Sequence, residues 1–233
     1  MNIIPNISVD CVVFGYNGNG VDVLLIKQKA TSENQESQYA LPGNLVRTNE
    51  DLDSAALRVL NDLTQLKGIY LKQFKAFGDP NRVTNPKDKA WLNEVREFPN
   101  ERVITVAYYS LVSEEDYEPR PAEFAATSEW VSLKNLPPLA FDHDEILHQA
   151  IATLRNELIT ENIGFELLPK KFTLSQLQEL HEIILDKKLD KRNFRKSMKK
   201  MNKLIALDEK QKGVDHKPAQ LFQYEPNQSD TEN

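Results

Sequence analysis

A helix expected over residues 191–201 can bury only one narrow strip of its surface, and this restricts how the C-terminal part of the chain can fold. Its apolar side chains, Phe194, Met198 and Met201, fall on one face at positions i, i+4 and i+7. The remaining surface is mostly cationic and carries Lys191, Arg192, Arg195, Lys196, Lys199 and Lys200. Such a helix needs one packing partner for its apolar seam and water or an anionic ligand for its other faces.

The neighbouring elements supply a partner for that seam. Thr173 and Gln176 have the spacing of a capping box, which predicts the start of another helix, and Asp190 is a good N-cap for the cationic helix. The buried stripe of the first helix is expected to be Leu174, Leu177, Leu180, Ile184 and Leu185. Two short strands are expected afterwards, at residues 204–207 and 220–224, around a polar loop with Gly213. This is the element order of a winged helix-turn-helix.

The charge distribution agrees with this interpretation. Residues 168–203 carry 11 Lys or Arg against 4 Asp or Glu, a balance of +7, although the whole chain has a net charge of −6. One acidic body with one basic segment is typical of a protein that meets a polyanion through a single part. A solvated helix face is the alternative explanation of charge alone. Helix spacing, charge and the predicted hairpin together favour binding to duplex DNA.

The position of each polar residue suggests its role at the DNA. Arg192 and Asn193 lie near the N-terminal end of the cationic helix, where side chains reach base edges. Lys residues further along the helix are placed for phosphates, which add affinity without sequence information. The predicted DNA-contacting residues are Thr173, Ser175, Gln176, Lys191, Arg192, Asn193, Arg195, Lys196, Lys199, Lys200, His216 and Lys217.

The residues before this segment predict a separate α+β body. Residues 17–20 have the composition of a hairpin turn, and a helix with apolar residues at helical spacing begins near residue 50. Asn49 or Glu50 is expected to cap that helix. The expected strands are residues 7–14, 21–27, 39–46, 69–77, 102–112 and 128–133, and a second helix covers about residues 144–159.

Three features of the body have simple structural interpretations. Cys11 lies in an apolar run, which predicts a buried strand residue, and a single cysteine excludes an internal disulfide. His143 between Asp142 and Asp144 could suggest a metal site, but Asp142 or Asp144 is better explained as the N-cap of the second helix. The polar segment 79–101 is too long for a tight turn, and long loops in compact domains are often functional.

We expect the protein to be cytoplasmic. No stretch reaches the roughly 18 apolar residues that a membrane span requires, and no basic region followed by an apolar core marks a signal peptide. The single cysteine fits a reducing compartment.

One part of the body carries the spacing of a catalytic motif. The Nudix box reads Gly-x5-Glu-x7-Arg-Glu-U-x-Glu-Glu-x-Gly-U, where U is an aliphatic residue. With Asn44 at the first glycine, Glu50 falls on the first glutamate and Arg58 on the arginine, and both aliphatic positions are filled. The segment therefore resembles a Nudix box, although both glycines are replaced, the second by Gln65.

The most important departures from the motif concern metal binding. Nudix hydrolases hold a divalent metal with the glutamate after the arginine and with the later glutamate pair; these positions are Val59, Asp62 and Leu63 here. Mg²⁺ prefers oxygen ligands, so one aspartate cannot replace three carboxylates, and losing the metal removes nucleophile activation. We expect no catalytic residues, no metal and no hydrolysis. Glu50 and Arg58 are interpreted as a charge pair that fixes the loop on the helix.

The whole chain resembles the Nudix-related transcriptional regulators, which couple a degenerate Nudix domain to a C-terminal winged helix and control NAD metabolism or sugar use. Residues 172–178 and 189–196 are similar to their DNA-binding unit, and residues 218–222 are similar to their wing. The implied fold class is α+β, an α/β/α Nudix sandwich with a mixed sheet, followed by a winged helix-turn-helix. The implied parts are a Nudix-like domain at 1–160, the winged helix at 161–226 and a disordered tail at 227–233.

The resemblance also implies partners. Such a protein would be a repressor that binds a duplex operator as a homodimer, with half-sites about 34–36 Å or a multiple apart. Its Nudix domain would bind a small effector, either an ADP-ribose-like nucleotide or a sugar, without a cofactor. The candidate effector-binding residues come from loops beside the box and are Arg47, Phe77, Asp79, Arg82 and Arg102.

Two other classes of function are open at this point. The first is an active Nudix hydrolase of nucleoside diphosphate derivatives with a basic appendage, which turnover in the presence of Mg²⁺ or Mn²⁺ would identify. The second is an RNA-binding or scaffold module, against which a preference for duplex DNA over single strands would argue.

Overall fold

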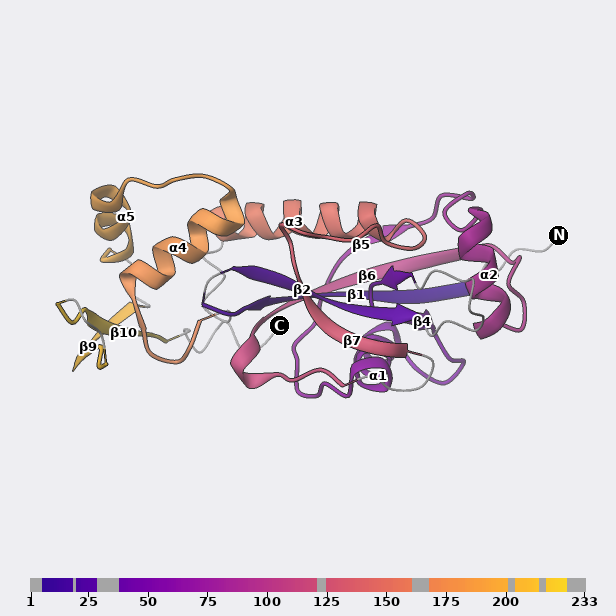
Figure 1. Cartoon of the computed structure of the whole chain (residues 1–233), viewed down its shortest axis with the longest axis horizontal. Coiled ribbons are helices and arrows are strands. Elements are labelled where there is room, and N and C mark those ends of the chain that lie inside the picture. The colour runs from indigo at the N-terminus through magenta and orange to yellow at the C-terminus, as the bar shows by residue number, and fades with distance from the viewer. Residues whose placement is uncertain are drawn as a thin grey trace.

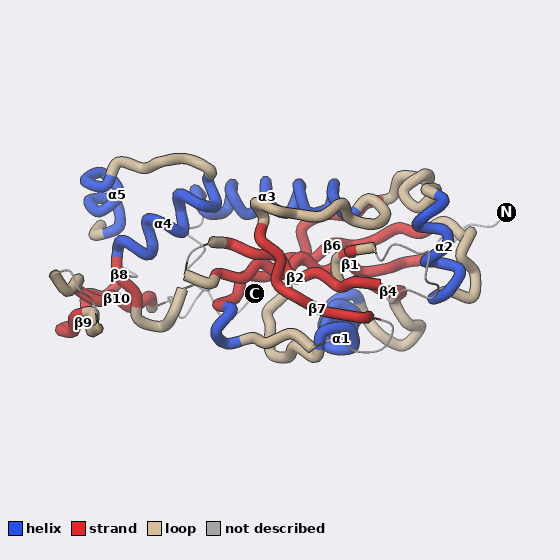
Figure 2. The backbone as a smooth tube through the Cα atoms, in the orientation of Figure 1, coloured by secondary structure: helices blue, strands red, loops and turns tan. Residues whose placement is uncertain are grey.

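The computed structural model describes residues 6–18, 20–28, 38–120, 125–160, 168–200, 204–213 and 217–225. The described chain forms an elongated molecule with two sheets, a large one in the body and a small one at the C-terminal end (Figure 1). In the body, α1 (Leu52–Thr64) and α3 (His143–Thr160) cover opposite faces of the large sheet, and α2 (Pro86–Val95) lies at its far end (Figures 1 and 2). This arrangement is an α/β/α sandwich.

The large sheet is mixed, as the sequence predicts. Its main path runs β3-β2-β1-β6-β5, with β4 paired to β1 and β7 paired to β2. The central pair β1 and β6 is parallel and the other pairs are antiparallel. The strands are β1 (Asn6–Tyr16), β2 (Val21–Gln28), β3 (Tyr39–Ala40), β4 (Gly43–Leu45), β5 (Lys72–Phe77), β6 (Val103–Ser113) and β7 (Ala125–Ser132).

The central strand β1 contributes side chains to two apolar clusters, because successive side chains of a strand point to opposite faces of the sheet. Val9, Cys11 and Val13 join the cluster under α1. Val12 and Phe14 join the cluster under α3. The prediction that Cys11 is a buried strand residue is confirmed, and burial raises the pKa of its thiol far above its usual value, so the thiol stays protonated.

The C-terminal unit contains α4 (Leu174–Leu185), α5 (Lys191–Met198), β9 (Leu204–Lys210) and β10 (Gln220–Tyr224). Both predicted helix caps are confirmed: Thr173 and Gln176 form a capping box, and the Asp190 side chain accepts from the backbone NH of Asn193. The sequence did not reveal β8 (Phe172–Thr173), which pairs with β10 and completes a three-stranded sheet. Helix α5 ends at Met198, and the third seam residue, Met201, lies outside the described residues.

Two details of the body differ from the sequence predictions. The N-cap of α1 is Asp51 rather than Asn49 or Glu50, since the Glu50 carboxylate is engaged by Arg58. Segment 79–101 is not one loop but contains α2, which begins at a proline after the N-cap Asn85. The helix was missed because its apolar face is weak and three prolines surround or open it.

The expected capping by the aspartates around His143 is also not what the structure shows. The Asp142 carboxylate accepts two hydrogen bonds from Arg82, and one Asp144 carboxylate oxygen lies 3.4 Å from the backbone nitrogen of Leu139. Asp142 therefore joins the start of α3 to the loop after β5 instead of capping the helix. Across the ranges given above, no group of three or more His, Cys, Asp or Glu side chains is placed to hold a metal ion.

The body and the C-terminal unit pack directly against each other. The cluster beneath α3 continues into the C-terminal unit, where it includes Leu177 and Phe172. Near the C-terminal half of α3, Arg155 donates from Nε to the carbonyl oxygen of Ile184 in α4 at 2.7 Å. The carbonyls of the last turn of a helix have no partner within the helix. This contact therefore gives the Ile184 carbonyl a donor and also joins the two units. None of the described helices is long and apolar enough to cross a membrane.

Candidate nucleic-acid interface and effector pocket

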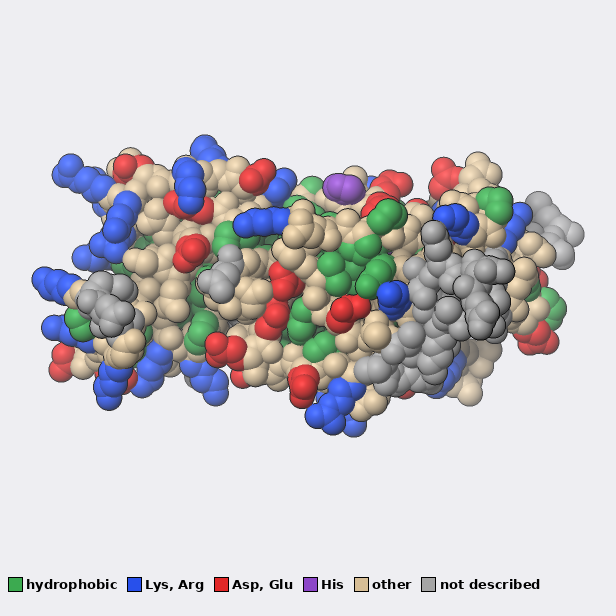
Figure 3. Space-filling view, viewed as in Figure 1, with side chains coloured by type: hydrophobic (Ala, Val, Ile, Leu, Met, Phe, Trp, Pro, Cys, Tyr) green, Lys and Arg blue, Asp and Glu red, His purple; other side chains and the backbone are tan. Residues whose placement is uncertain are grey.

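Helix α5 presents its cationic surface to solvent and buries its apolar seam. Phe194 and Met198 are buried, and the ring of Phe194 meets His181 of α4 edge to face with centroids 5.2 Å apart. On the same helix and the turn after it, the exposed residues are Lys191, Arg192, Asn193, Lys196, Ser197, Lys199 and Lys200. In the space-filling view, Lys and Arg side chains gather at the end of the molecule formed by α5 and the β9–β10 hairpin (Figure 3).

The N-terminal end of α5 has the polar residues expected for base recognition. Arg192 and Asn193 both lie in its first turn and are exposed. Arg195 is partly buried and donates from Nη2 to the hydroxyl of Ser175 at 3.3 Å, which joins the first turn of α4 to the last turn of α5. Arg192 and Asn193 are therefore free to meet a groove, while Arg195 braces the two helices against each other.

Not every predicted DNA contact is equally available. Thr173 is buried, and its hydroxyl accepts from the backbone NH of Gln176. The Gln176 side chain returns the contact by accepting from the backbone NH of Thr173 at 2.8 Å. Both groups therefore serve the cap of α4. In the hairpin loop, Lys217 is exposed and His216 lies outside the described residues.

The residues at the Nudix box positions form a network of charges without a cation site. Arg58 donates from Nε and Nη2 to the two carboxylate oxygens of Glu50 at 2.8 and 2.5 Å, and from Nη2 to the Leu45 carbonyl at 3.0 Å. These contacts hold the pKa of Glu50 at about 2. The Oδ2 atom of Asp62 lies 3.4 Å from Nη1 of Arg58 and 3.7 Å from Nη2 of Arg47. The loop is thereby fixed to α1, as the sequence interpretation of Glu50 and Arg58 expects.

A divalent metal does not fit these residues. Val59 and Leu63 are fully buried in the apolar cluster between α1 and the sheet. The two carboxylates that remain, Glu50 and Asp62, are already compensated by arginines. A hard cation needs several anionic oxygen ligands, and here positive guanidinium groups occupy the surroundings of both.

The residue that replaces the second glycine of the Nudix box adopts an unusual backbone conformation. Gln65 is the C-cap of α1 and adopts a left-handed conformation with φ 60°. Glycine is the usual residue at this place because a side chain is disfavoured there. The helix therefore still ends as a glycine-terminated helix does, at a cost in strain.

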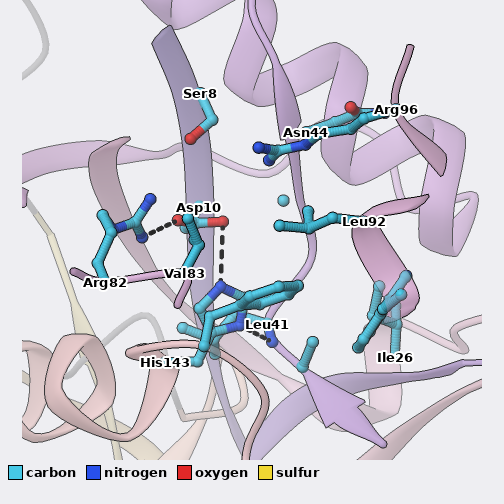
Figure 4. Close-up of a pocket in the computed structure, with 14 residues that line it drawn as sticks. Ser8, Asp10, Ile26, Leu41, Asn44, Arg82, Val83, Leu92, Arg96 and His143 are labelled. Atoms are coloured by element: carbon cyan, nitrogen blue, oxygen red, sulfur yellow. Dashed lines mark hydrogen bonds and ion pairs between the residues drawn. The ribbon is translucent and has the colours of Figure 1, made fainter. Parts of the chain in front are cut away.

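A small recess lies in the body beneath α2, and its floor is a buried chain of charges (Figure 4). Asp10 is the centre of the chain: its carboxylate lies 3.5 Å from Nη2 of Arg82 and 3.5 Å from Nε2 of His143. Arg82 also forms two hydrogen bonds with Asp142. The backbone NH of Leu41 donates to Nδ1 of His143 at 2.9 Å. Burial lowers the pKa of His143, so its ring is neutral and directs its remaining proton, on Nε2, toward Asp10.

Only one of the five candidate effector residues lines this recess, namely Arg82. Phe77 is buried in the apolar cluster, and its ring centroid lies 6.3 Å from that of Phe74. The other three are exposed: Arg47 beside Asp62, Asp79 in a turn where it accepts from Asn81, and Arg102 donating to the Gly78 carbonyl.

Sequence reasoning missed most of the recess. Asp10 carried a usable signal, because a lone carboxylate in a run of buried strand residues needs a partner. Trp91 and Arg96 carried none, because α2 was not expected. The other side chains that line the recess include Asn44, Leu92 and Phe141.

Comparisons with known proteins agree with both halves of this description. A family model described as the NUDIX domain matches residues 5–150, and one described as the NrtR DNA-binding winged helix domain matches residues 164–224. The chain is 31% identical over 224 residues to the ADPR responsive transcriptional repressor NtrR of Acinetobacter baylyi, covering 94% of this chain and 82% of that protein.

Two further relatives concern the fold and the alternative function of a Nudix hydrolase. The crystal structure of Shewanella oneidensis NrtR complexed with a 27mer DNA superposes with a TM-score of 0.72 at 25% identity, covering 94% of this chain and 93% of that one. An ADP-ribose pyrophosphatase of Methanocaldococcus jannaschii is 26% identical over 143 residues, which cover 61% of this chain and 71% of the enzyme.

Proposed function

Because the chain belongs to the NrtR-type transcriptional regulators, which join a Nudix domain to a DNA-binding winged helix, we propose that it represses transcription from an operator whose occupancy responds to ADP-ribose. The one observation that carries DNA binding is the exposed cationic surface of α5 above its buried seam. ADP-ribose is favoured over a sugar because the relative from Acinetobacter baylyi is named as responsive to it.

We assign the parts of the chain as follows. Residues 1–160 form the effector-sensing domain, 161–226 the DNA-binding domain and 227–233 a tail. The matches to the two family models, which end at 150 and begin at 164, support a junction between them.

Base recognition is assigned to the first turn of α5, and phosphate binding to its later lysines. Arginine pairs best with guanine and asparagine with adenine, so Arg192 and Asn193 specify sequence. Lys196, Lys199 and Lys200 lie along the exposed side and supply charge.

We also propose that the protein acts as a homodimer on a two-fold operator. A single α5 reads one half-site, and two copies related by a two-fold axis read two half-sites separated by about 34–36 Å or a multiple. Sedimentation of the free protein and the spacing of protected bases on a bound duplex test this independently of the effector.

The second candidate function is hydrolysis of ADP-ribose, which the likeness to the archaeal pyrophosphatase raises. The arginines around Glu50 and Asp62 and the buried Val59 and Leu63 argue against it. We therefore assign no catalytic activity to the Nudix domain. Incubation of ADP-ribose with the protein and Mg²⁺ or Mn²⁺ is expected to leave it intact; turnover that disappears in Asp62→Ala would establish an enzyme instead.

The experiment that tests the proposal measures operator affinity with and without effector. Duplexes are first selected from a random library, and binding of the best one is then titrated at fixed salt in the presence of ADP-ribose, ribose or no addition. We expect ADP-ribose to change the affinity at least 10-fold and ribose to leave it unchanged. An equal affinity in all three conditions would remove ADP-ribose as the effector, and a preference for single strands would remove the DNA-binding role.

A further inference from the structure

A cavity of about 440 Å³, here called the junction cavity, lies where the body meets the C-terminal unit. Its walls come from the turn between β1 and β2, from the residues after β7, and from α3 and α4 (Figure 1). Small-molecule sites occupy about 300–1,000 Å³ and are frequent where two units meet. The junction cavity is distinct from the recess beneath α2, because the two have no lining residue in common.

Aliphatic side chains from both units form much of the wall of the junction cavity. They include Leu133 after β7, Ile151 and Leu154 of α3, and Ile183 and Ile184 of α4. Leu154 and Ile184 are buried, whereas the other three are only partly buried. A ligand that covered these side chains would remove apolar surface from water and gain about 25 cal/mol for each Å². The walls therefore favour a ligand with an aliphatic body.

The charged side chains that line the junction cavity are two cations and two anions, namely Lys134, Arg155, Asp22 and Asp186. None of the four forms an ion pair with any residue that the structure describes. Opposite charges thus line one cavity without neutralising each other at contact distance. A lining with both signs and no net charge fits a zwitterion better than a ligand of one sign.

The two cations offer a site for a carboxylate. Arg155 uses Nε to hold the carbonyl oxygen of Ile184, and its two terminal nitrogens have no partner among the described residues. A guanidinium binds a carboxylate through two parallel N–H groups. The ammonium of Lys134 also lacks a described partner and adds a second positive charge to the same cavity.

The two anions offer a site for an ammonium group. Asp22 accepts a hydrogen bond from Nδ2 of Asn17 at 2.9 Å. Burial and the charge of Asp22 raise the pKa of the neighbouring Glu114 to about 7. Since adjacent carboxyl groups repel each other when both are ionised, a cation beside Asp22 is favoured. Asp186 is the C-cap of α4, and its carboxylate has no partner in the described part of the chain.

We propose that the junction cavity binds a free α-amino acid with an aliphatic side chain. Arg155 and Lys134 hold the carboxylate of the ligand, and the aliphatic walls hold its side chain. Asp22 and Asp186 hold its ammonium group. A ligand in this place contacts both the body and the C-terminal unit, and it binds independently of the ADP-ribose effector.

The first experiment tests the ligand class with matched probes on the full chain. L-leucine carries both charges and an aliphatic body, whereas isocaproate lacks the amino group, isoamylamine lacks the carboxylate and glycine lacks the aliphatic body. Calorimetry is expected to give at least 10-fold tighter binding of leucine than of each of the other three. No binding of leucine, or equal affinity for leucine and any one of the other probes, overturns the proposal.

The second experiment compares two variants that each remove one exposed lysine from the body. Lys134 lines the junction cavity, and Lys67 does not. We expect Lys134→Gln to weaken leucine binding by at least 10-fold and Lys67→Gln to leave it unchanged. Equal affinities of the two variants would overturn the carboxylate site.

A third measurement places the ligand in the junction cavity. Ile151→Phe adds a larger side chain at a partly buried position of the wall. It should abolish leucine binding, while thermal denaturation and ADP-ribose binding stay as in wild type. In wild type, saturating ADP-ribose should leave leucine bound. Leucine binding that survives Ile151→Phe, or that ADP-ribose abolishes, would place the ligand elsewhere and overturn the proposal.

Discussion

Arg58 and Glu50 form a two-pronged ion pair in which the guanidinium meets both carboxylate oxygens, at 2.8 and 2.5 Å. The two side chains are only 15% and 13% exposed. The pair holds the loop before α1 on the helix, and this has measurable consequences.

Removing one partner of this pair should destabilise the body. Arg58→Met removes the guanidinium donors of the Glu50 carboxylate and of the Leu45 carbonyl and leaves Glu50 only the backbone NH of Arg47. We expect a loss of about 2–4 kcal/mol in the free energy of unfolding. Urea denaturation measures it, and Arg58→Met combined with Glu50→Gln should recover part of the loss. Arg47→Gln is the control, since Arg47 is 65% exposed and 3.7 Å from Asp62; it should change stability by less than about 0.5 kcal/mol.

The same pair predicts an acid dependence of stability. The folded-state pKa of Glu50, about 2, lies below its unfolded value near 4.3. The contribution of Glu50 is therefore complete above pH 4.3 and is lost as the pH falls toward 2. Denaturation midpoints measured between pH 5 and 2 should decline less steeply in Glu50→Gln than in wild type, and parallel curves would contradict the assignment.

A second pH dependence belongs to the winged helix. Burial against Phe194 lowers the pKa of His181 to about 4. In the unfolded chain His181 takes up a proton near pH 6.5, whereas in the folded chain it stays neutral down to about pH 4. The free energy of unfolding is therefore unaffected above pH 6.5. Between pH 6.5 and 4 it falls by up to about 1.4 kcal/mol per pH unit. Hydrogen exchange of the α4 amides should report this loss, and His181→Phe should reduce it. His148→Gln, at an exposed site, should leave it unchanged.

The strained end of α1 predicts a stabilising substitution. Gln65 has φ 60°, a conformation that glycine adopts without a side-chain penalty. Gln65→Gly should therefore raise the unfolding free energy by about 0.5–1 kcal/mol, while Gln65→Ala should bring no such gain. Thermal denaturation of the two variants distinguishes relief of strain from loss of a glutamine contact.

Two substitutions on α5 should have different effects on DNA binding. Arg192→Ala is expected to relax sequence preference, at about 1–3 kcal/mol per specified base pair. Lys199→Ala should weaken all duplexes alike and reduce the salt dependence by about 0.9 in the slope of log affinity against log salt. Competition between matched and mutated duplexes at several salt concentrations checks both, and equal loss of specificity in the two variants would contradict these roles.

Much of the fold was predictable because local signals agree with tertiary packing. The capping box at Thr173, the N-cap at Asp190 and the narrow seam of α5 each require only a few neighbouring residues. The two-residue strand β8 has no such signal, since it is defined entirely by pairing with β10. Likewise, Asp51 replaced Glu50 as a cap because Arg58, eight residues along the chain from Glu50, takes the Glu50 carboxylate.

The recess beneath α2 was much harder to predict than helix α5. Side chains of α5 share one helix, so their spacing in the chain places them on one surface. The recess is assembled from Asp10, Arg82, Arg96 and His143, which lie on different elements. Arg82 was found because it is a cation near the box, whereas Arg96 depends on a helix that opens with a proline and lacks a clear apolar face.

Helix α3 begins beside the charged floor of the recess at His143, and further along it Arg155 holds the last turn of α4. Its 18 residues span about 27 Å. A rigid rod of that length pivoting by about 5° at one end shifts the other by roughly 2 Å, a displacement comparable to the helix shifts of known allosteric interfaces. A rotation of α3 about its start at His143 would therefore also displace the last turn of α4, which Arg155 holds.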